Sequence, residues 1–336
     1  MKKLFAMLVI MLLVVGVFTG CSKEEPATTA KSETKTEAAK ETETEAVAVA
    51  EEPSAKDITI GYSFQGLSDE YIVFLKEAVD AKAAELGVNI LIADGQMSAE
   101  KQISQIENFI AQKVDVIVMN PISMDGCAPA VAAAVEAGIP IVNLISITSN
   151  QDMATSYVGS NSVESGEIEM QLAADGLGGK GNIVVMFGQM GHDAQIGRYE
   201  GLNNILADYP DIQIVAEQTG NWSREEGMAI MENWLSSGKE IDAVVAQNDS
   251  MALGAIMAIE AKGLTGEIQV YGIDATPEAI LALEAGTMNG TVFQDAVGQG
   301  GGSVEIALKI AMGETVDSNV YIPYLPVLKE DVADYK

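Results

Sequence analysis

The stretch "AVVAQNDSMALGAI", residues 243–256, joins the end of a strand-like run to the start of a helical pattern. Its apolar run stops at three consecutive polar residues, Gln247, Asn248 and Asp249. One interpretation is a strand that ends at the surface, with Asp249 or Ser250 capping the next helix. The other is a strand that ends at a ligand, because ligands of open α/β sheets bind outside the carboxyl ends of the strands.

Similar strand-like runs alternate with helical patterns along most of the chain. They lie at 58–64, 88–94, 115–120, 139–144, 182–188, 212–218, 241–248, 268–274 and 290–294. After the first run, Ile72, Leu75 and Val79 have helical spacing, so we expect a helix over 69–87. This alternation indicates parallel sheets covered on both faces, and 57–336 is too long for one compact core. We therefore expect an α/β fold of two doubly wound parallel-sheet lobes.

The N-terminal segment predicts export. Lys2 and Lys3 precede an apolar run that ends at Phe18, which is typical of a secretory signal peptide over 1–20. A membrane-spanning anchor is the alternative, but the run is short for one.

The residues after the signal predict a lipid anchor and a tether. "FTGC", residues 18–21, resembles the signal of bacterial lipoproteins, in which Cys21 becomes the lipidated first residue, although Phe18 stands where leucine is usual. A simple secreted protein is the alternative. Residues 21–56 are rich in Glu and Lys and contain no aromatic residue. Such a composition buries too little apolar surface to fold, so we expect a disordered acidic tether.

Charge and composition exclude several classes of partner. The chain has a net charge of −30, of which residues 1–56 carry only −2, so 57–336 carry −28. A domain this acidic repels nucleic acid and disfavours an anionic ligand. Cys127 is the one cysteine beyond the anchor and His192 is the one histidine, so we expect no disulfide, zinc site or other metal site. Cys127 fits a small buried side chain better than a reactive thiol.

Enzyme and cofactor motifs are missing from the sequence. No P-loop occurs, no G-x-G-x-x-G follows the first strand, and no Ser-His-Asp set sits at a nucleophile elbow. We expect no cofactor and no enzymatic activity. A glycosidase that uses Asp249 and Asp274 as its two carboxylates is the alternative considered.

Polar and aromatic residues gather where the predicted strands end. They are Gln65, Asp69, Tyr71, Ile72, Asn120, Asn143, Ser146, Arg198, Trp222, Asn248, Asp274 and Gln294. Each has a structural alternative: Asp274 could cap a helix near Pro277, and Arg198 could pair with a surface glutamate. Together, amides, carboxylates and an arginine suit the hydroxyls of a neutral polyhydroxylated ligand, and flat rings suit its C–H faces.

Three stretches make the resemblance to a known family specific. "AQNDSMALGA" (246–255), "GIDATPEAI" (272–280) and "VFQD" (292–295) are similar to the ribose- and galactose-type periplasmic binding proteins, the substrate-binding subunits of ABC importers. The similarity extends from about residue 57 to the end of the chain. It implies ligand contacts at Gln65, Asp69, Tyr71, Ile72, Asn120, Arg198, Trp222, Asn248, Asp274 and Gln294.

The sequence departs from that family at one place in the site. After "IPIV" (139–142) the sugar binders usually have an Asp-Arg pair, whereas this chain has Ile145 and Ser146. Asn143 and Ser146 are candidates to replace part of that clamp, and His192 and Gln195 are candidates to reach in from the second lobe. The identity of the sugar or polyol therefore stays open.

The resemblance also implies the domain organisation. It predicts lobes of 57–160 plus 295–323 and of 161–294 plus 324–336, joined by a three-segment hinge. The chain would cross between the lobes near Ser160, Gln294 and Pro323.

The function implied is that of a monomeric, lipid-anchored, extracytoplasmic receptor that passes a neutral sugar or polyol to an ABC permease. A sugar-type signal receptor for chemotaxis, a sensor kinase or a furanosyl signal is the alternative. A repressor with this fold would need a DNA-binding segment in place of the signal peptide. Within the opening stretch, we expect Asn248 to contact ligand and Asp249 to cap the helix that follows.

Overall fold

A computed structural model describes residues 54–335 of the chain. The predicted signal peptide, Cys21 and most of the predicted tether lie outside the described residues. The last residues of that tether belong to a 3₁₀ helix, η1 (Ala55–Asp57), that precedes the first strand. Within 54–335, no helix combines the length and the apolar character needed to cross a membrane.

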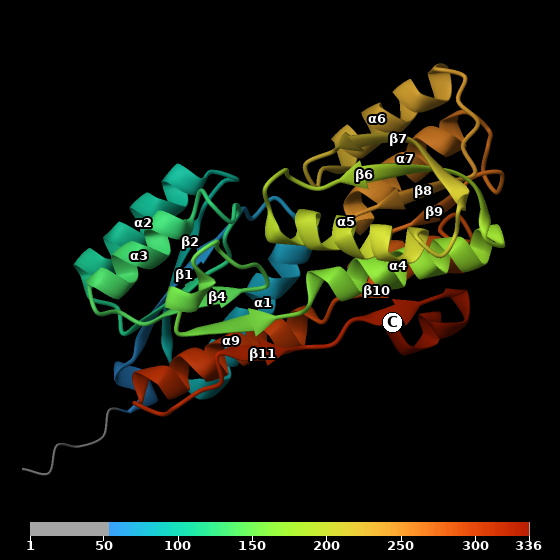
Figure 1. Cartoon of the computed structure of the whole chain (residues 1–336). Coiled ribbons are helices and arrows are strands. Elements are labelled where there is room, and N and C mark those ends of the chain that lie inside the picture. The colour runs from blue at the N-terminus through green and yellow to red at the C-terminus, as the bar shows by residue number, and fades with distance from the viewer. Residues whose placement is uncertain (1–53, 336) are drawn as a thin grey trace, which may run out of the picture. The chain divides into compact units, whose positions relative to one another are not determined.

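The first sheet has six parallel strands in the order β11-β5-β4-β3-β1-β2. Its strands are β1 (Thr59–Phe64), β2 (Asn89–Asp94), β3 (Val116–Met119), β4 (Ile141–Leu144), β5 (Ser156–Gly159) and β11 (Asn319–Tyr321). One face packs against α1 (Glu70–Leu86) and α9 (Ala296–Ala311). The other face packs against α2 (Ala99–Gln112) and α3 (Ala128–Glu136), so both faces are covered (Figure 1).

The second sheet has four parallel strands in the order β7-β6-β8-β9. They are β6 (Lys180–Phe187), β7 (Asp211–Thr219), β8 (Ala243–Ala246) and β9 (Gln269–Tyr271). Helices α4 (Ser162–Leu177) and α5 (Asp193–Leu206) cover one face. Helices α6 (Arg224–Ser236), α7 (Asp249–Ala261) and α8 (Pro277–Ala285) cover the other. The predicted fold of two doubly wound parallel-sheet lobes is therefore confirmed.

A small antiparallel sheet modifies the predicted pattern. The run at 290–294, predicted as part of the second parallel series, forms β10 (Thr291–Phe293), which pairs antiparallel with β12 (Leu325–Val327). Single parallel bridges join this segment to Tyr271 and Asp274. The sequence did not predict β5, β11 or β12, in which no more than two apolar residues follow one another. Two further 3₁₀ helices are η2 (Gln151–Met153) and η3 (Lys329–Tyr335).

Three connections link the elements of the two large sheets. The chain leaves β5 of the first sheet and enters α4, which packs on the second. It leaves β10 and enters α9, which packs against α1. It then leaves β11, paired with β5, and enters β12, paired with β10. The residue limits of the two lobes stay a prediction.

The ends of α1 show why its sequence folds as a helix there. The Asp69 carboxylate accepts a hydrogen bond from the backbone N–H of Ile72 (3.3 Å), which makes it the N-cap. Gly87 at the other end has φ of 74°, a left-handed conformation that glycine adopts without strain. The predicted helix over 69–87 is confirmed, and it holds Asp69, Tyr71 and Ile72 at the carboxyl end of β1.

A glycine lets α4 approach α5 closely enough to place Arg198. A Cβ atom added at Gly166 would lie only 2.1 Å from the backbone carbonyl oxygen of Arg198. The two helices therefore pack backbone to backbone at this point, and no side chain fits between them.

We expect Gly166→Ala to lower the free energy of unfolding by about 1–3 kcal/mol through overpacking. Gly302→Ala is the matched control, because a Cβ there would have an ordinary contact, 3.7 Å from Val158 Cγ1. That change should stabilise the protein by about 0.5–1 kcal/mol, since alanine is the better residue inside a helix. Urea unfolding of both variants measures the difference, and equal stabilities would contradict the close-packing explanation.

Candidate ligand-binding site

The carboxyl ends of strands from both large sheets surround one cavity. The space between its walls measures about 370 Å³, including its opening to solvent. The lining residues are Gln65, Asp69, Tyr71, Ile72, Ile145, His192, Ala194, Arg198, Trp222, Asn248, Asp274 and Gln294. Ten of these were predicted from the sequence. Ile145 was named only as a replacement in the usual Asp-Arg pair, and Ala194 was not predicted.

Three predicted residues do not line the cavity. Asn120 lies behind Gln65, where its Oδ1 accepts from the Gln65 backbone N–H (3.2 Å). Asn143 donates from Nδ2 to Thr148 Oγ1 (3.2 Å) and to Gln151 Oε1 (2.5 Å), within its own loop. Ser146 is buried beside the cavity, and Ile145 faces it instead. The wall left by the missing Asp-Arg pair is therefore apolar.

His192 fixes a contact across the cavity. Its Nδ1 accepts from the backbone N–H of Ala194 (3.0 Å), so the proton of the neutral ring is on Nε2. Nε2 therefore donates to Gln65 Oε1 (2.9 Å). Burial lowers the pKa of His192 to about 3, which keeps the ring neutral at pH 7. Gln195, also considered from the sequence, lies outside the lining.

Arg198 is the one cation that lines the cavity, and it is 5% exposed. It donates from Nη1 to the Gln247 carbonyl oxygen and from Nη2 to Gln294 Oε1 (2.9 Å). Its guanidinium carbon lies 5.7 Å from the ring centre of Trp222. The alternative of a surface ion pair with a glutamate is wrong, because Arg198 is buried.

Two buried donors of the lining have no partner within residues 54–335. They are Arg198 Nε and Trp222 Nε1. A buried donor without an acceptor costs about 1–3 kcal/mol, so such atoms indicate a site that an incoming group completes.

Two carboxylates oppose these donors. Burial raises the pKa of Asp69 to about 6 and that of Asp274 well above its ordinary value, while the nearby charge of Arg198 lowers both. A hydrogen bond from a ligand would offset this desolvation. Thr276, and not Asp274, caps α8, so the alternative role considered for Asp274 is wrong.

The backbone is strained at three lining residues. Ile145, Trp222 and Asp274 have φ of 54°, 66° and 131°, in the range that favours glycine. For Ile145, with its branched Cβ, this conformation is rare. Strain of this kind costs about 1–3 kcal/mol per residue and clusters at functional sites.

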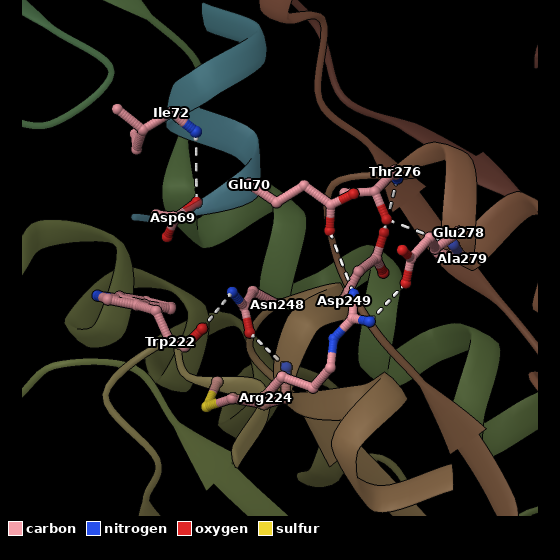
Figure 2. Close-up of polar contacts among 11 residues, drawn as sticks. Asp69, Glu70, Ile72, Trp222, Arg224, Asn248, Asp249, Thr276, Glu278 and Ala279 are labelled. Carbon is pink, nitrogen blue, oxygen red and sulfur yellow. Dashed lines mark hydrogen bonds and ion pairs between the residues drawn. The ribbon is translucent and has the colours of Figure 1, made fainter. Parts of the chain in front are cut away.

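The structure corrects one prediction made for residues 243–256 (Figure 2). Asn248, not Asp249, is the N-cap of α7, because its Oδ1 accepts from the Met251 backbone N–H (3.0 Å) and its own backbone is extended. Its Nδ2 donates to the Trp222 carbonyl oxygen (3.2 Å), which fixes the strained loop that carries the indole ring. Asn248 therefore caps the helix and lines the cavity at once.

Asp249 instead binds a neighbouring loop. Its carboxylate accepts from the Thr276 backbone N–H (2.8 Å) and from Thr291 Oγ1 (2.7 Å), and it is fully buried. It does not line the cavity. It therefore cannot act with Asp274 as a pair of glycosidase carboxylates, and that alternative is wrong.

A second hollow adjoins the cavity and shares Asp69 and Trp222 with it. Arg224 lies in its wall and pairs with Glu70 of α1 (3.4 Å) and Glu278 of α8 (2.5 Å), as Figure 2 shows. All three side chains are partly exposed, so these pairs contribute little stability. They do join α6 to the helix that Asp69 caps.

Within the described part of the chain, no group of three or more His, Cys, Asp and Glu residues could hold a metal ion. Cys127 lies elsewhere, fully buried, and donates from Sγ to Gln102 Oε1 (3.2 Å), and burial raises its pKa. As predicted, it is a buried side chain.

Comparison with known proteins defines the class. The model of the periplasmic binding protein domain family matches residues 60–315. A putative rhizopine-binding protein of Rhizobium meliloti is 40% identical over 86% of this chain and 96% of its own. A xylitol-binding protein of Mycolicibacterium smegmatis is 36% identical over 82% and 78%. The chain belongs to the periplasmic binding protein family, and the predicted resemblance is confirmed.

A solved structure agrees with this assignment. The solute-binding protein of an ABC transporter from Bacillus halodurans, with bound myo-inositol, is 42% identical with a TM-score of 0.81, over 84% of this chain and 98% of its own. These relatives are binding proteins and not enzymes.

The cap assignment makes a stability prediction. Asn248→Ala should lower the free energy of unfolding by about 0.5–2 kcal/mol, whereas Asn248→Ser, which keeps an oxygen for the Met251 N–H, should recover part of that loss. Asp249→Ala should cost about 1–3 kcal/mol, because the Thr276 N–H is left buried without a partner. Urea unfolding measures all three. If Asn248→Ser is no more stable than Asn248→Ala, Asn248 is not the cap.

Proposed function

We propose that this protein is an extracytoplasmic receptor that captures a neutral sugar or polyol in its interlobe cavity and delivers it to an ABC permease. The binding residues of this proposal are Gln65, Asp69, Tyr71, Ile72, His192, Arg198, Trp222, Asn248, Asp274 and Gln294. No bond is made or broken, and lobe closure performs the capture.

The observation that carries the proposal is that unpaired hydrogen-bond donors and buried carboxylates line the same cavity. Buried donors without partners, on Arg198 and Trp222, face the same space as the desolvated carboxylates of Asp69 and Asp274. A hydroxyl group donates one hydrogen bond and accepts two, so a ligand with several hydroxyls satisfies both sets. Ile145 and the faces of Trp222 and Tyr71 suit its C–H groups.

The relatives support a small polyhydroxylated ligand. Myo-inositol is bound in the Bacillus halodurans structure, and xylitol is named for the Mycolicibacterium relative. Both proteins share at least 36% identity with this chain. Ile145 makes this wall apolar. The wall therefore fits a ligand that makes fewer hydrogen bonds here than it would to an Asp-Arg pair.

Contacts between the two halves of the cavity support closure around the ligand. Besides the His192–Gln65 bond, the Met124 backbone N–H donates to the Gly191 carbonyl oxygen (3.1 Å). We propose lobes of 57–160 plus 295–323 and 161–294 plus 324–336, because the chain changes sheets after β5, β10 and β11. The receptor acts as a monomer, held to the membrane through lipidated Cys21.

Binding to wild-type protein tests the ligand class. We expect at least one of myo-inositol, xylitol and ribose to raise the melting temperature, because a ligand present at about 100 times its Kd stabilises the folded state by about 2.7 kcal/mol. Titration calorimetry then gives the Kd. If none of the three binds, the proposed ligand class is wrong.

Two aspartate variants show where that ligand binds. Asp274→Asn should weaken binding by about 1.5–3 kcal/mol, the value of a hydrogen bond to a charged group. Asp211→Asn, at the exposed start of β7, should leave the Kd unchanged.

The anchor is tested by Cys21→Ala. Lipidation needs the thiol, so the variant should be released or kept as an unlipidated precursor, while wild-type protein fractionates with membranes. Detergent phase separation and mass spectrometry of the mature N-terminus measure this. A variant that loses its signal peptide and still fractionates fully with membranes would show that Cys21 is not the anchor.

A further inference from the structure

A buried glutamine that does not line the cavity joins several residues that do. Gln299 of α9 is fully buried, and its Oε1 accepts hydrogen bonds from the Tyr71 hydroxyl and from Gln294 Nε2 (3.2 Å). Its Nε2 donates to Ser160 Oγ (2.7 Å). Tyr71 and Gln294 line the cavity, so Gln299 is bonded directly to two residues that can contact a ligand.

The direction of these bonds follows from Arg198. A guanidinium only donates, so the atom of Gln294 that faces it has to be Oε1. The Gln294 amide nitrogen is thereby turned toward Gln299. The atom of Gln299 that accepts its hydrogen bond has to be Oε1. Tyr71 meets the same oxygen and has to donate to it. Its hydroxyl proton is committed, and Tyr71 can only accept from a ligand.

The same network reaches all three connections between the sheets. Ser160 lies between β5 and α4, Gln294 between β10 and α9, and Tyr324 between β11 and β12. The Tyr324 hydroxyl donates to Gln294 Oε1 (3.3 Å), and Ser160 holds Gln299. Gln294 lines the cavity and Tyr324 is bonded to it, whereas Ser160 reaches the lining through Gln299.

We propose that Gln299 is a positioning residue that fixes Tyr71 as an acceptor toward the ligand and holds the amide of Gln294 in the orientation that Arg198 sets. The inference rests on the proposed function and deepens it. The ligand presents a hydroxyl that donates to Tyr71 and an oxygen that accepts from Gln294. The bonds to Ser160 and Tyr324 tie this arrangement to the connections between the sheets, which move when the lobes close.

Gln299→Met tests the proposal, because methionine has a similar length and offers no amide. Tyr71 and Gln294 then lose their common acceptor, and the Tyr71 hydroxyl loses the bond that fixes its proton. With myo-inositol as the probe, the Kd measured by titration calorimetry should rise at least about tenfold.

A double-mutant cycle separates positioning from general structural damage. Tyr71→Phe should weaken binding of myo-inositol in the wild-type background but have little further effect beside Gln299→Met, because the two residues act as a unit. Gln102→Met is the matched control. Gln102 is equally buried and hydrogen-bonded, but none of its partners lines the cavity. Its variant should lose stability, keep the parent Kd, and show additive effects with Tyr71→Phe.

If Gln299→Met does not fold, Ser160→Ala replaces it in the test. It removes only the acceptor of Gln299 Nε2, and it should raise the Kd about two- to fivefold with the same non-additivity toward Tyr71→Phe. A Kd within about threefold of wild type for Gln299→Met, or additive effects in the cycle, would overturn the inference while the proposed function stands. If wild-type protein binds none of myo-inositol, xylitol and ribose, the proposed function fails, and the inference fails with it.

Discussion

The buried guanidinium of Arg198 is the constraint on which the cavity depends. A charge this deeply buried is tolerated only when acceptors surround it. The Gln247 carbonyl oxygen and Gln294 Oε1 supply two of them, and burial leaves the nearby carboxyl of Glu169 with a pKa well above its ordinary value. Because a guanidinium cannot accept a hydrogen bond, it fixes the orientation of every amide that touches it. Arg198 therefore sets the direction of the hydrogen bonds that Gln294, its neighbour in the cavity lining, can make.

Desolvation gives the site its electrostatic character. Burial raises the pKa values of Asp69 and Asp274, although Asp69 stays partly exposed. In a domain of net charge −28, an anionic ligand would meet repulsion from the whole surface as well as from these groups. A neutral hydroxyl group can donate to these carboxylates and accept from Arg198 and Trp222, which is the basis of the proposed function.

Parallel strand topology explains how residues distant in the sequence reach one cavity. Gln65 follows β1, His192 follows β6, and Asp274 follows β9, and parallel strands that end at one edge bring such residues together. The loops that carry them are strained at Ile145, Trp222 and Asp274. Local hydrogen bonds hold that strain, as when Asn248 binds the carbonyl oxygen of Trp222.

The sequence by itself determined the two-lobed α/β fold and most of the cavity lining, because strand periodicity and polar residues at strand ends are local patterns. The resemblance to a known family added His192, which was considered because the usual Asp-Arg pair is missing. Only the tertiary structure decided that Asn248 and not Asp249 caps α7, that Asn143 turns into its own loop, and that Gln299 joins Tyr71 to Ser160. The first two are local choices that residue type does not decide, since Asn and Asp cap helices equally well, and only the third depends on contacts across the fold. Tyr71 and Gln299 are 228 residues apart, and hydrogen-bond partners at such a distance leave no period or spacing in the sequence.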